Sequence, residues 1–131
     1  MSSGKPMELL HRVFKALADT TRLRIFNLLL HGPLCVCELE SFLGVSQPLI
    51  SRHLAYLRNA GLVRDRRQGM RVQYSVVLET KTLETLAGFL RDALESEEVY
   101  REDLSKWKQA NSPCCELSPV SRFLTTDGEM R

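Results

Sequence analysis

Apolar residues recur at three- and four-residue steps through most of the chain, which predicts a mainly helical protein. Glycines, prolines and short polar side chains able to cap helices divide this pattern into segments. Helices are expected over residues Met7–Ala18, Thr21–Leu30, Val36–Leu43, Ser46–Ala60 and Thr80–Lys108. We expect the last of these to be one long helix whose apolar positions extend from Leu83 to Leu104.

The stretch between the last two expected helices has the pattern of a β-hairpin. Two strand-like runs, Leu62-Val63 and Val72–Val77, flank the turn Arg67-Gln68-Gly69. Two helices joined by the break Leu43–Ser46 and followed by a basic hairpin have the element order of a winged helix-turn-helix. The predicted fold class is therefore mainly α with a small β-hairpin, in a winged helix-turn-helix.

The length of 131 residues predicts one domain. We expect it to occupy residues 7–110, between a disordered N-terminus at 1–6 and a flexible, cysteine-containing tail at 111–131. No apolar run approaches the ~18 residues of a membrane span, and residues 1–6 lack the pattern of a signal peptide. We therefore expect a cytoplasmic protein with no membrane partner, whose four cysteines act as ligands or reactive groups rather than as disulfides.

Positive charge is concentrated in the first part of the chain. Up to Leu78 there are eleven lysines and arginines against five acidic residues, whereas from Glu79 onward there are seven against eleven. This distribution favours a polyanion such as DNA as the partner of the first part. The alternative is a merely solvated basic surface. The arginines lie on both the helix and the hairpin, which are the two elements that a winged helix-turn-helix places against DNA. This position favours DNA as the partner.

The expected helix Ser46–Ala60 has the composition of a recognition helix. Its apolar residues share one side, which leaves short polar groups and Arg52 to reach base edges. The hairpin arginines are spaced to contact phosphates or the minor groove. The predicted DNA-binding residues are Ser46, Gln47, Ser51, Arg52, Arg66, Arg67 and Arg71. His53 adjoins the apolar side, so we expect it to pack in the core rather than to bind a metal.

Two segments of the chain carry a family resemblance. Ala16–Ile25 (ALADTTRLRI) is similar to a junction between two helices, and Ser46–Leu54 (SQPLISRHL) is similar to a recognition helix, in the ArsR/SmtB family of metalloregulatory repressors. The resemblance covers about Met7–Leu90. It implies a homodimer, formed by the first and last helices, that binds near-palindromic, double-stranded operator DNA when no inducer is present.

A pair of cysteines opens the third expected helix. The segment Cys35-Val36-Cys37-Glu38-Leu39 is similar to the Cys-Val-Cys-Asp-Leu box of the arsenic-responsive branch of that family. Thiolates select soft ions, and two of them on a short segment form a chelate. Side chains two residues apart diverge on a helix but share one side of an extended chain. Binding of one ion by both Cys35 and Cys37 therefore favours a non-helical start to this helix. Ion binding is then expected to unwind or tilt it and to release DNA.

The box lacks a third thiolate. Many arsenic sensors of this branch have a cysteine where this chain has Glu40, so the third sulfur is expected from the tail. The predicted metal ligands are Cys35, Cys37, Cys114 and Cys115. As(III) or Sb(III), which prefers three sulfurs, is the expected inducer, and four cysteines also permit Cd(II), Pb(II) or Zn(II). The family's other common site requires histidine on the last helix, and all three histidines precede it.

Other interpretations of the cysteines remain open. Cys35 and Cys37 can be small buried hydrophobes, the Cys114-Cys115 pair can be incidental, and zinc can be structural. A repressor of the same fold that senses oxidants or persulfide would join a box cysteine to a tail cysteine as a disulfide switch. An enzyme such as a thiol oxidoreductase is disfavoured, because the chain has neither a Cys-x-x-Cys motif nor a glycine-rich phosphate loop.

Overall fold

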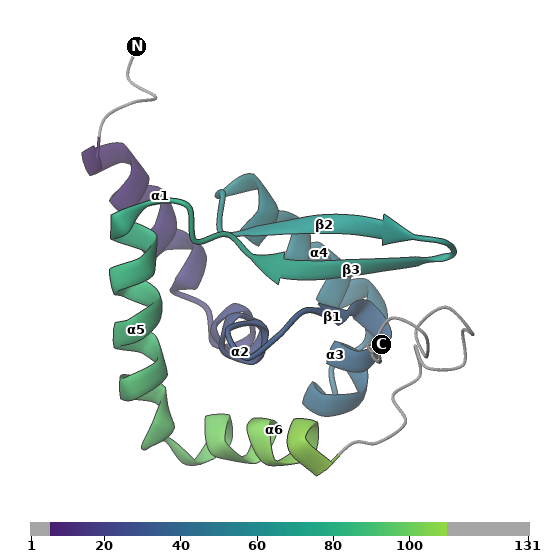
Figure 1. Ribbon diagram of the computed structural model, residues 1–131. Coiled ribbons are helices and arrows are strands. Elements are labelled where there is room, and N and C mark those ends of the chain that lie inside the picture. Colours follow the sequence, from purple (N-terminus) through teal and green to yellow (C-terminus); the bar gives the residue numbers. More distant parts are fainter. Residues whose placement is uncertain (1–5, 110–131) are drawn as a thin grey trace, which may run out of the picture.

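The computed structural model describes residues 6–109 (Figure 1). They form six helices and three strands: α1 (Pro6–Leu17), α2 (Thr20–Leu29), β1 (Leu34–Cys35), α3 (Val36–Leu43), α4 (Gln47–Asn59), β2 (Val63–Gln68), β3 (Arg71–Val76), α5 (Lys81–Glu95) and α6 (Glu98–Gln109). Helices α3 and α4 form the helix-turn-helix, and β2 and β3 form the wing. The predicted winged helix-turn-helix fold is confirmed.

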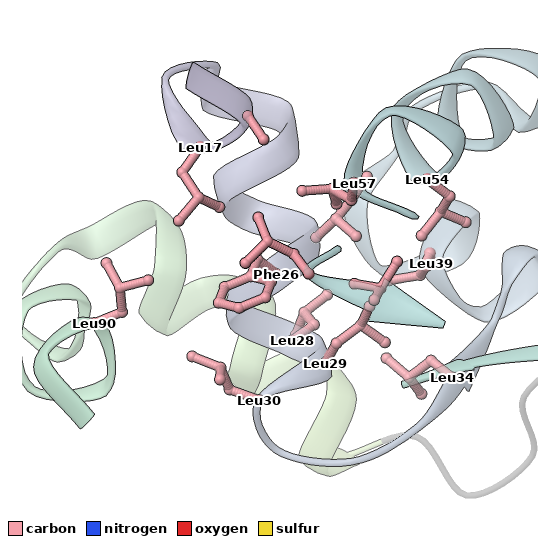
Figure 2. Packing of buried hydrophobic residues seen from close by; sticks show 14 of the residues in the cluster. Leu17, Phe26, Leu28, Leu29, Leu30, Leu34, Leu39, Leu54, Leu57 and Leu90 are labelled. Atoms are coloured by element: carbon pink, nitrogen blue, oxygen red, sulfur yellow. The ribbon is translucent and has the colours of Figure 1, made fainter. Parts of the chain in front are cut away.

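Helix α2 lies at the centre of the hydrophobic core. It begins at Asp19, whose carboxylate accepts a hydrogen bond from the backbone N–H of Arg22 at 3.0 Å. Every residue from Ile25 to Leu30 is buried, and Phe26 and Leu28 lie among leucines of α3, α4 and α5 in Figure 2. Because each fully buried leucine or phenylalanine contributes about 1.5–3 kcal/mol, this cluster fixes α3 and α4 relative to the rest of the fold.

The wing belongs to a three-stranded antiparallel sheet of order β1-β3-β2. Strand β1 was not predicted, because two residues are too few to show an alternating pattern. The predicted turn begins two residues too early, because β2 continues to Gln68, which pairs with Arg71. The loop is therefore Gly69-Met70, and the φ of 66° at Gly69 is one that glycine adopts without strain.

The prediction of one long final helix is wrong. Helix α5 ends at Glu95, and α6 begins at Glu98 and turns across the base of the molecule to pack against α2 and α3 (Figure 1). The buried positions of α5, which end at Leu94, continue at helical spacing onto Arg101, whereas the buried residues of α6 are Tyr100 and Asp103. The apolar stripe therefore changes phase between the two. No helix of the described part is long and apolar enough to cross a membrane.

Candidate functional site

Helix α4 presents the predicted base-reading residues on its outer side. Ser46 is the N-cap, and Pro48 lies in the first turn, where a missing N–H costs no helical hydrogen bond. The inner side of α4 is fully buried through Ile50, Leu54 and Leu57. Four predicted residues are exposed: Ser46, Gln47, Ser51 and Arg52. This side of α4 therefore offers hydroxyl, amide and guanidinium groups to a partner.

A contact that the sequence did not predict holds the outer side of α4 to the start of α2. The guanidinium of Arg22 lies 4.0 Å from the centre of the Tyr56 ring, and its Nη1 lies 3.3 Å from Nδ1 of His53. Its Nε also donates to the carbonyl of Ala16 at 2.6 Å. His53 is half-buried at this contact, and Arg22 lies within the ALADTTRLRI segment that carries the resemblance. We interpret the role of the Arg22 and His53 side chains as orienting α4.

The arginines of the wing divide into paired and unpaired ones. Arg64 bonds Glu79 at 2.8 Å, and Arg58 at the end of α4 bonds Asp65 at 3.1 Å. The predicted DNA-binding residues Arg52, Arg66 and Arg67 are exposed and form no ion pair within residues 6–109. The wing extends away from the core, so Arg66 and Arg67 are accessible to a partner beside α4 (Figure 1).

Arg71, the last predicted DNA-binding residue, has a different environment from Arg66 and Arg67. It opens β3 opposite Gln68 and is half-buried. Its Nε is shielded from solvent and has no hydrogen-bond partner among the described residues. A role for Arg71 in DNA binding stays a prediction, and its reach toward a phosphate is smaller than that of the exposed arginines.

The two cysteines of the box lie together where β1 passes into α3. Cys35 has an extended backbone, with φ −100° and ψ 171°, and is the N-cap of α3, whereas Cys37 lies in the first turn. Their Sγ atoms are 3.5 Å apart. Neither cysteine is free, and both are disulfide-bonded in the structure, which differs from the expectation that they act as ligands or reactive groups rather than as disulfides. Cys35 is extended, whereas Cys37 is already helical, and the structure brings their two sulfur atoms together at the N-terminal end of α3.

Glu38 ties Cys35 to the first turn of α3. Its Oε1 accepts a hydrogen bond from the backbone N–H of Cys35 at 2.9 Å and lies 3.3 Å from the Sγ atom of Cys35. This is one half of a capping box, in which the third helical residue reaches back to the N-cap.

The cysteine pair is connected to both parts of the predicted DNA interface. Helix α3 packs directly against α4. In the sheet, Cys35 pairs with Gln73 and Gln73 pairs with Arg66, so the three side chains form one cross-strand row on the same face. The segment at Cys35 is therefore in contact with α4 through α3 and with the wing through β3.

The tail ligands lie outside the described residues. The predictions for Cys114 and Cys115, and for a tail at 111–131, cannot be compared with the structure because it describes residues 6–109. Within that range, no group of three or more histidine, cysteine, aspartate and glutamate side chains is placed to hold a metal ion.

Residues 19–65, from the start of α2 to the wing, match the model described as "bacterial regulatory protein, arsR family". This match includes both cysteines of the box and all of α4.

Two curated relatives and one solved structure show the same similarity. The chain is 59% identical over 63 residues to "Arsenic resistance transcriptional regulator ArsR1" of Pseudomonas putida (47% of this chain, 49% of the relative). It is 58% identical over 64 residues to "Arsenical resistance operon repressor" of Escherichia coli (48% and 55%). The aligned part thus spans about half the length of these relatives. The homodimeric winged helix-turn-helix DNA-binding domain Mb0332 of Mycobacterium bovis superposes with a TM-score of 0.59 at 26% identity (75% of this chain, 94% of that one).

Proposed function

Because the chain belongs to the arsR family of bacterial regulatory proteins, we propose that it is a homodimeric, cytoplasmic repressor that leaves operator DNA on binding trivalent arsenic or antimony. The observation that carries this proposal is the pair of Sγ atoms of Cys35 and Cys37, 3.5 Å apart between the wing sheet and the helix packed on α4. The similar proteins of P. putida and E. coli are named for arsenic resistance, which supports the same ion.

Once both cysteines are reduced to thiolates, their sulfur atoms at the present separation suit a chelate. If both lie ~2.3 Å from one ion, as in zinc–thiolate sites, a separation of 3.5 Å corresponds to an S–ion–S angle of about 100°. A regular tetrahedron of the same bond length would place them about 3.8 Å apart. The separation is therefore compatible with either a three-coordinate or a four-coordinate site.

Release of DNA follows from competition for the first turn of α3. Without the ion, Glu38 bonds the N-cap, and Cys35 is paired with Gln73 in the sheet. With the ion, two thiolates and a third ligand determine the path of this segment instead. A lost cap costs about 1 kcal/mol, so the ion needs only a small part of its binding energy to shift α3 against α4.

The position of α6 supports a third ligand from the tail of the same subunit. The Trp107 ring packs beside Gly32, where an added Cβ would lie 3.6 Å from Cζ2 of the indole. Gly32 is three residues before Cys35. The five residues from Gln109, the last residue of α6, to Cys114 would span up to ~17 Å when extended.

The dimer surface that we propose lies on α1 and α5, which are adjacent in Figure 1. Phe14 of α1 and Phe89 of α5 are 57% and 62% exposed. Together with Leu10 and Leu86 they line a shallow pocket between the two helices. An exposed apolar patch of this kind marks an interface, and a second copy of the chain would cover it.

The decisive experiment is a titration of the full chain, prebound to operator DNA, with arsenite, antimonite, cadmium, zinc and lead. Thiolate absorption and fluorescence anisotropy of the DNA are followed together. We expect arsenite and antimonite to release the DNA at one ion per subunit. Release by peroxide or persulfide, with arsenite ineffective, would support the second candidate, a thiol redox repressor. The disulfide-bonded state of Cys35 and Cys37 in the structure favours that candidate.

Arg52→Ala should weaken binding to the operator by roughly 1–3 kcal/mol and reduce discrimination against other sequences, because Arg52 is exposed and unpaired on α4. Arg66→Ala and Arg67→Ala should weaken binding to all DNA sequences alike and reduce the salt dependence of the affinity, as expected for phosphate contacts. Arg64→Ala is the matched control, since Arg64 already bonds Glu79. Equal effects of all four changes in anisotropy titrations at several salt concentrations would contradict this docking.

Removal of both tail thiols by Cys114→Ser/Cys115→Ser should weaken arsenite binding and lower the thiolate-to-arsenic ratio from three to two. The reason is that a third sulfur on the same chain closes the site without a separate encounter. Thiolate absorption during the titration measures both quantities. An unchanged affinity and ratio would show a two-cysteine site with a passive tail.

Mixed dimers distinguish a site within one subunit from a site across the dimer. One subunit carries Cys35→Ser/Cys37→Ser, and the other carries Cys114→Ser/Cys115→Ser. A site within one subunit leaves no complete set of three sulfurs in this dimer, so we expect the low affinity of the tail variant. Recovery of parental affinity in half of the sites would place the ligands across the interface.

A further inference from the structure

A cavity of about 690 Å³ lies between α2, α5 and α6, on residues that neither the DNA interface nor the cysteine pair uses. Its polar lining comes from all three helices and includes Asn27, Arg91, Asp92, Glu95, Arg101 and Lys108. The volume falls within the ~300–1,000 Å³ range of pockets that bind small molecules.

Asn27 gives this cavity an unsatisfied donor. It is 2% exposed, in the middle of the buried part of α2, and lines the cavity. Its Nδ2 is shielded from solvent and has no hydrogen-bond partner within residues 6–109. A buried amide N–H without a partner lowers stability, so a position that keeps one calls for an explanation. An oxygen atom of a bound molecule would supply the missing acceptor once a small shift of the lining side chains exposes Nδ2 to the cavity.

The charges around the cavity favour an anion. Three cations and two carboxylates line it, and none of these five groups forms an ion pair among the described residues. Burial, together with the positive charges of Arg91 and Lys108, lowers the pKa of the His31 ring at its edge. The cations are therefore suited to an acidic group, while Asp92 and Glu95 accept hydrogen bonds from hydroxyl or amino groups.

We propose that this cavity binds a small organic anion that carries a carboxylate together with hydroxyl or amino groups. The carboxylate accepts hydrogen bonds from Asn27 and from the cations of α5 and α6, and the other groups donate to Asp92 and Glu95. The site is separate from the cysteine pair, so its ligand binds whether or not the thiolates hold an ion. Binding joins α6 to α2 and α5 and stabilises the folded chain by mass action.

Isothermal titration calorimetry of the full chain with citrate and with glutamate tests this proposal. We expect saturable binding of at least one of them, and weaker or no binding of inorganic phosphate, which lacks the additional groups. No heat from either carboxylate up to about 10 mM would overturn the proposal. Equal binding of inorganic phosphate would also overturn it, because charge alone would then be sufficient.

Three variants place the binding in the cavity. Arg101→Gln should weaken carboxylate binding about tenfold or more, whereas Lys106→Gln, which removes an exposed cation of α6 outside the cavity, should leave it unchanged. Asn27→Leu should weaken binding and raise Tm by roughly 2–5 °C, because it removes an unsatisfied buried donor. Equal effects of Arg101→Gln and Lys106→Gln, or parental binding by Asn27→Leu, would overturn the proposal.

Discussion

Replacing Cys35 and Cys37 together by serine is expected to abolish release of DNA by arsenite while leaving the fold and operator binding intact. Serine has nearly the shape of cysteine, but its hydroxyl is a far poorer ligand for a soft ion. At position 35 it would also preserve the local structure, because serine is a preferred N-cap and Glu38 already occupies the third helical position. The α3 start is therefore retained while the chelate is lost.

The measurement is anisotropy of labelled operator DNA during addition of arsenite, with parental protein and both single variants beside the double one. Each single variant should lose nearly the whole response, since two sulfurs 3.5 Å apart bind as one unit. Val36→Ala provides a control that changes a side chain of the same segment without removing a ligand. If the double variant released operator DNA at the arsenite concentrations that act on the parental protein, the proposed site would be refuted. The interpretation of Cys35 and Cys37 as small buried hydrophobic residues would then be favoured.

Local sequence was enough to predict most of the fold. The bounds of α3 agree with the expected segment, and the N-cap of α4 at Ser46 was expected, because Gly44, Ser46 and Pro48 interrupt the helical pattern directly. The extended start at Cys35 followed from the geometry of chelation alone. These features depend on residues within a few positions of one another, so their signals lie together in the chain.

The features that the sequence did not reveal depend on contacts between distant residues. Strand β1 exists because Leu34 and Cys35 pair with Tyr74 and Gln73. The break before α6 was missed because Leu104 was assigned to the stripe of α5. Nothing near Asp103 indicates that its partner is Arg24, 79 positions earlier. Such pairings decide where α6 and the wing lie, and they become visible only in three dimensions.

This pairing of Arg24 with Asp103 should be the most sensitive point of the fold outside the apolar core. Asp103 is 1% exposed, and its two oxygens accept from Nε and Nη2 of Arg24, each at 2.9 Å. Nη2 also donates to the carbonyl of Leu43 at the end of α3. The bond to Asp103 raises the pKa of Arg24, which shows that the carboxylate stabilises the charged guanidinium. One arginine thus joins α2, α3 and α6.

Asp103→Ala is therefore expected to lower the free energy of unfolding by about 2–4 kcal/mol. Breaking a buried pair costs ~3–5 kcal/mol, and the value is reduced here because the Arg24 side chain remains 19% exposed to water. Urea denaturation followed by circular dichroism measures the change. Glu102→Ala, which removes the exposed neighbouring carboxylate on α6, should change the same quantity by less than about 0.5 kcal/mol.

The double variant Arg24→Met/Asp103→Leu should recover most of the lost stability, because it removes both charges instead of leaving one unpaired. If Asp103→Ala cost no more than Glu102→Ala, the pair would not be what holds α6 in place.

The loss of the Arg24–Asp103 pair has a further consequence if the tail supplies the third thiolate. Loosening α6 moves the start of the tail away from Gly32 and lowers its effective concentration at the box. Arsenite affinity of folded Asp103→Ala should then fall toward that of the Cys114→Ser/Cys115→Ser variant, whereas parental affinity would show that α6 does not position the tail.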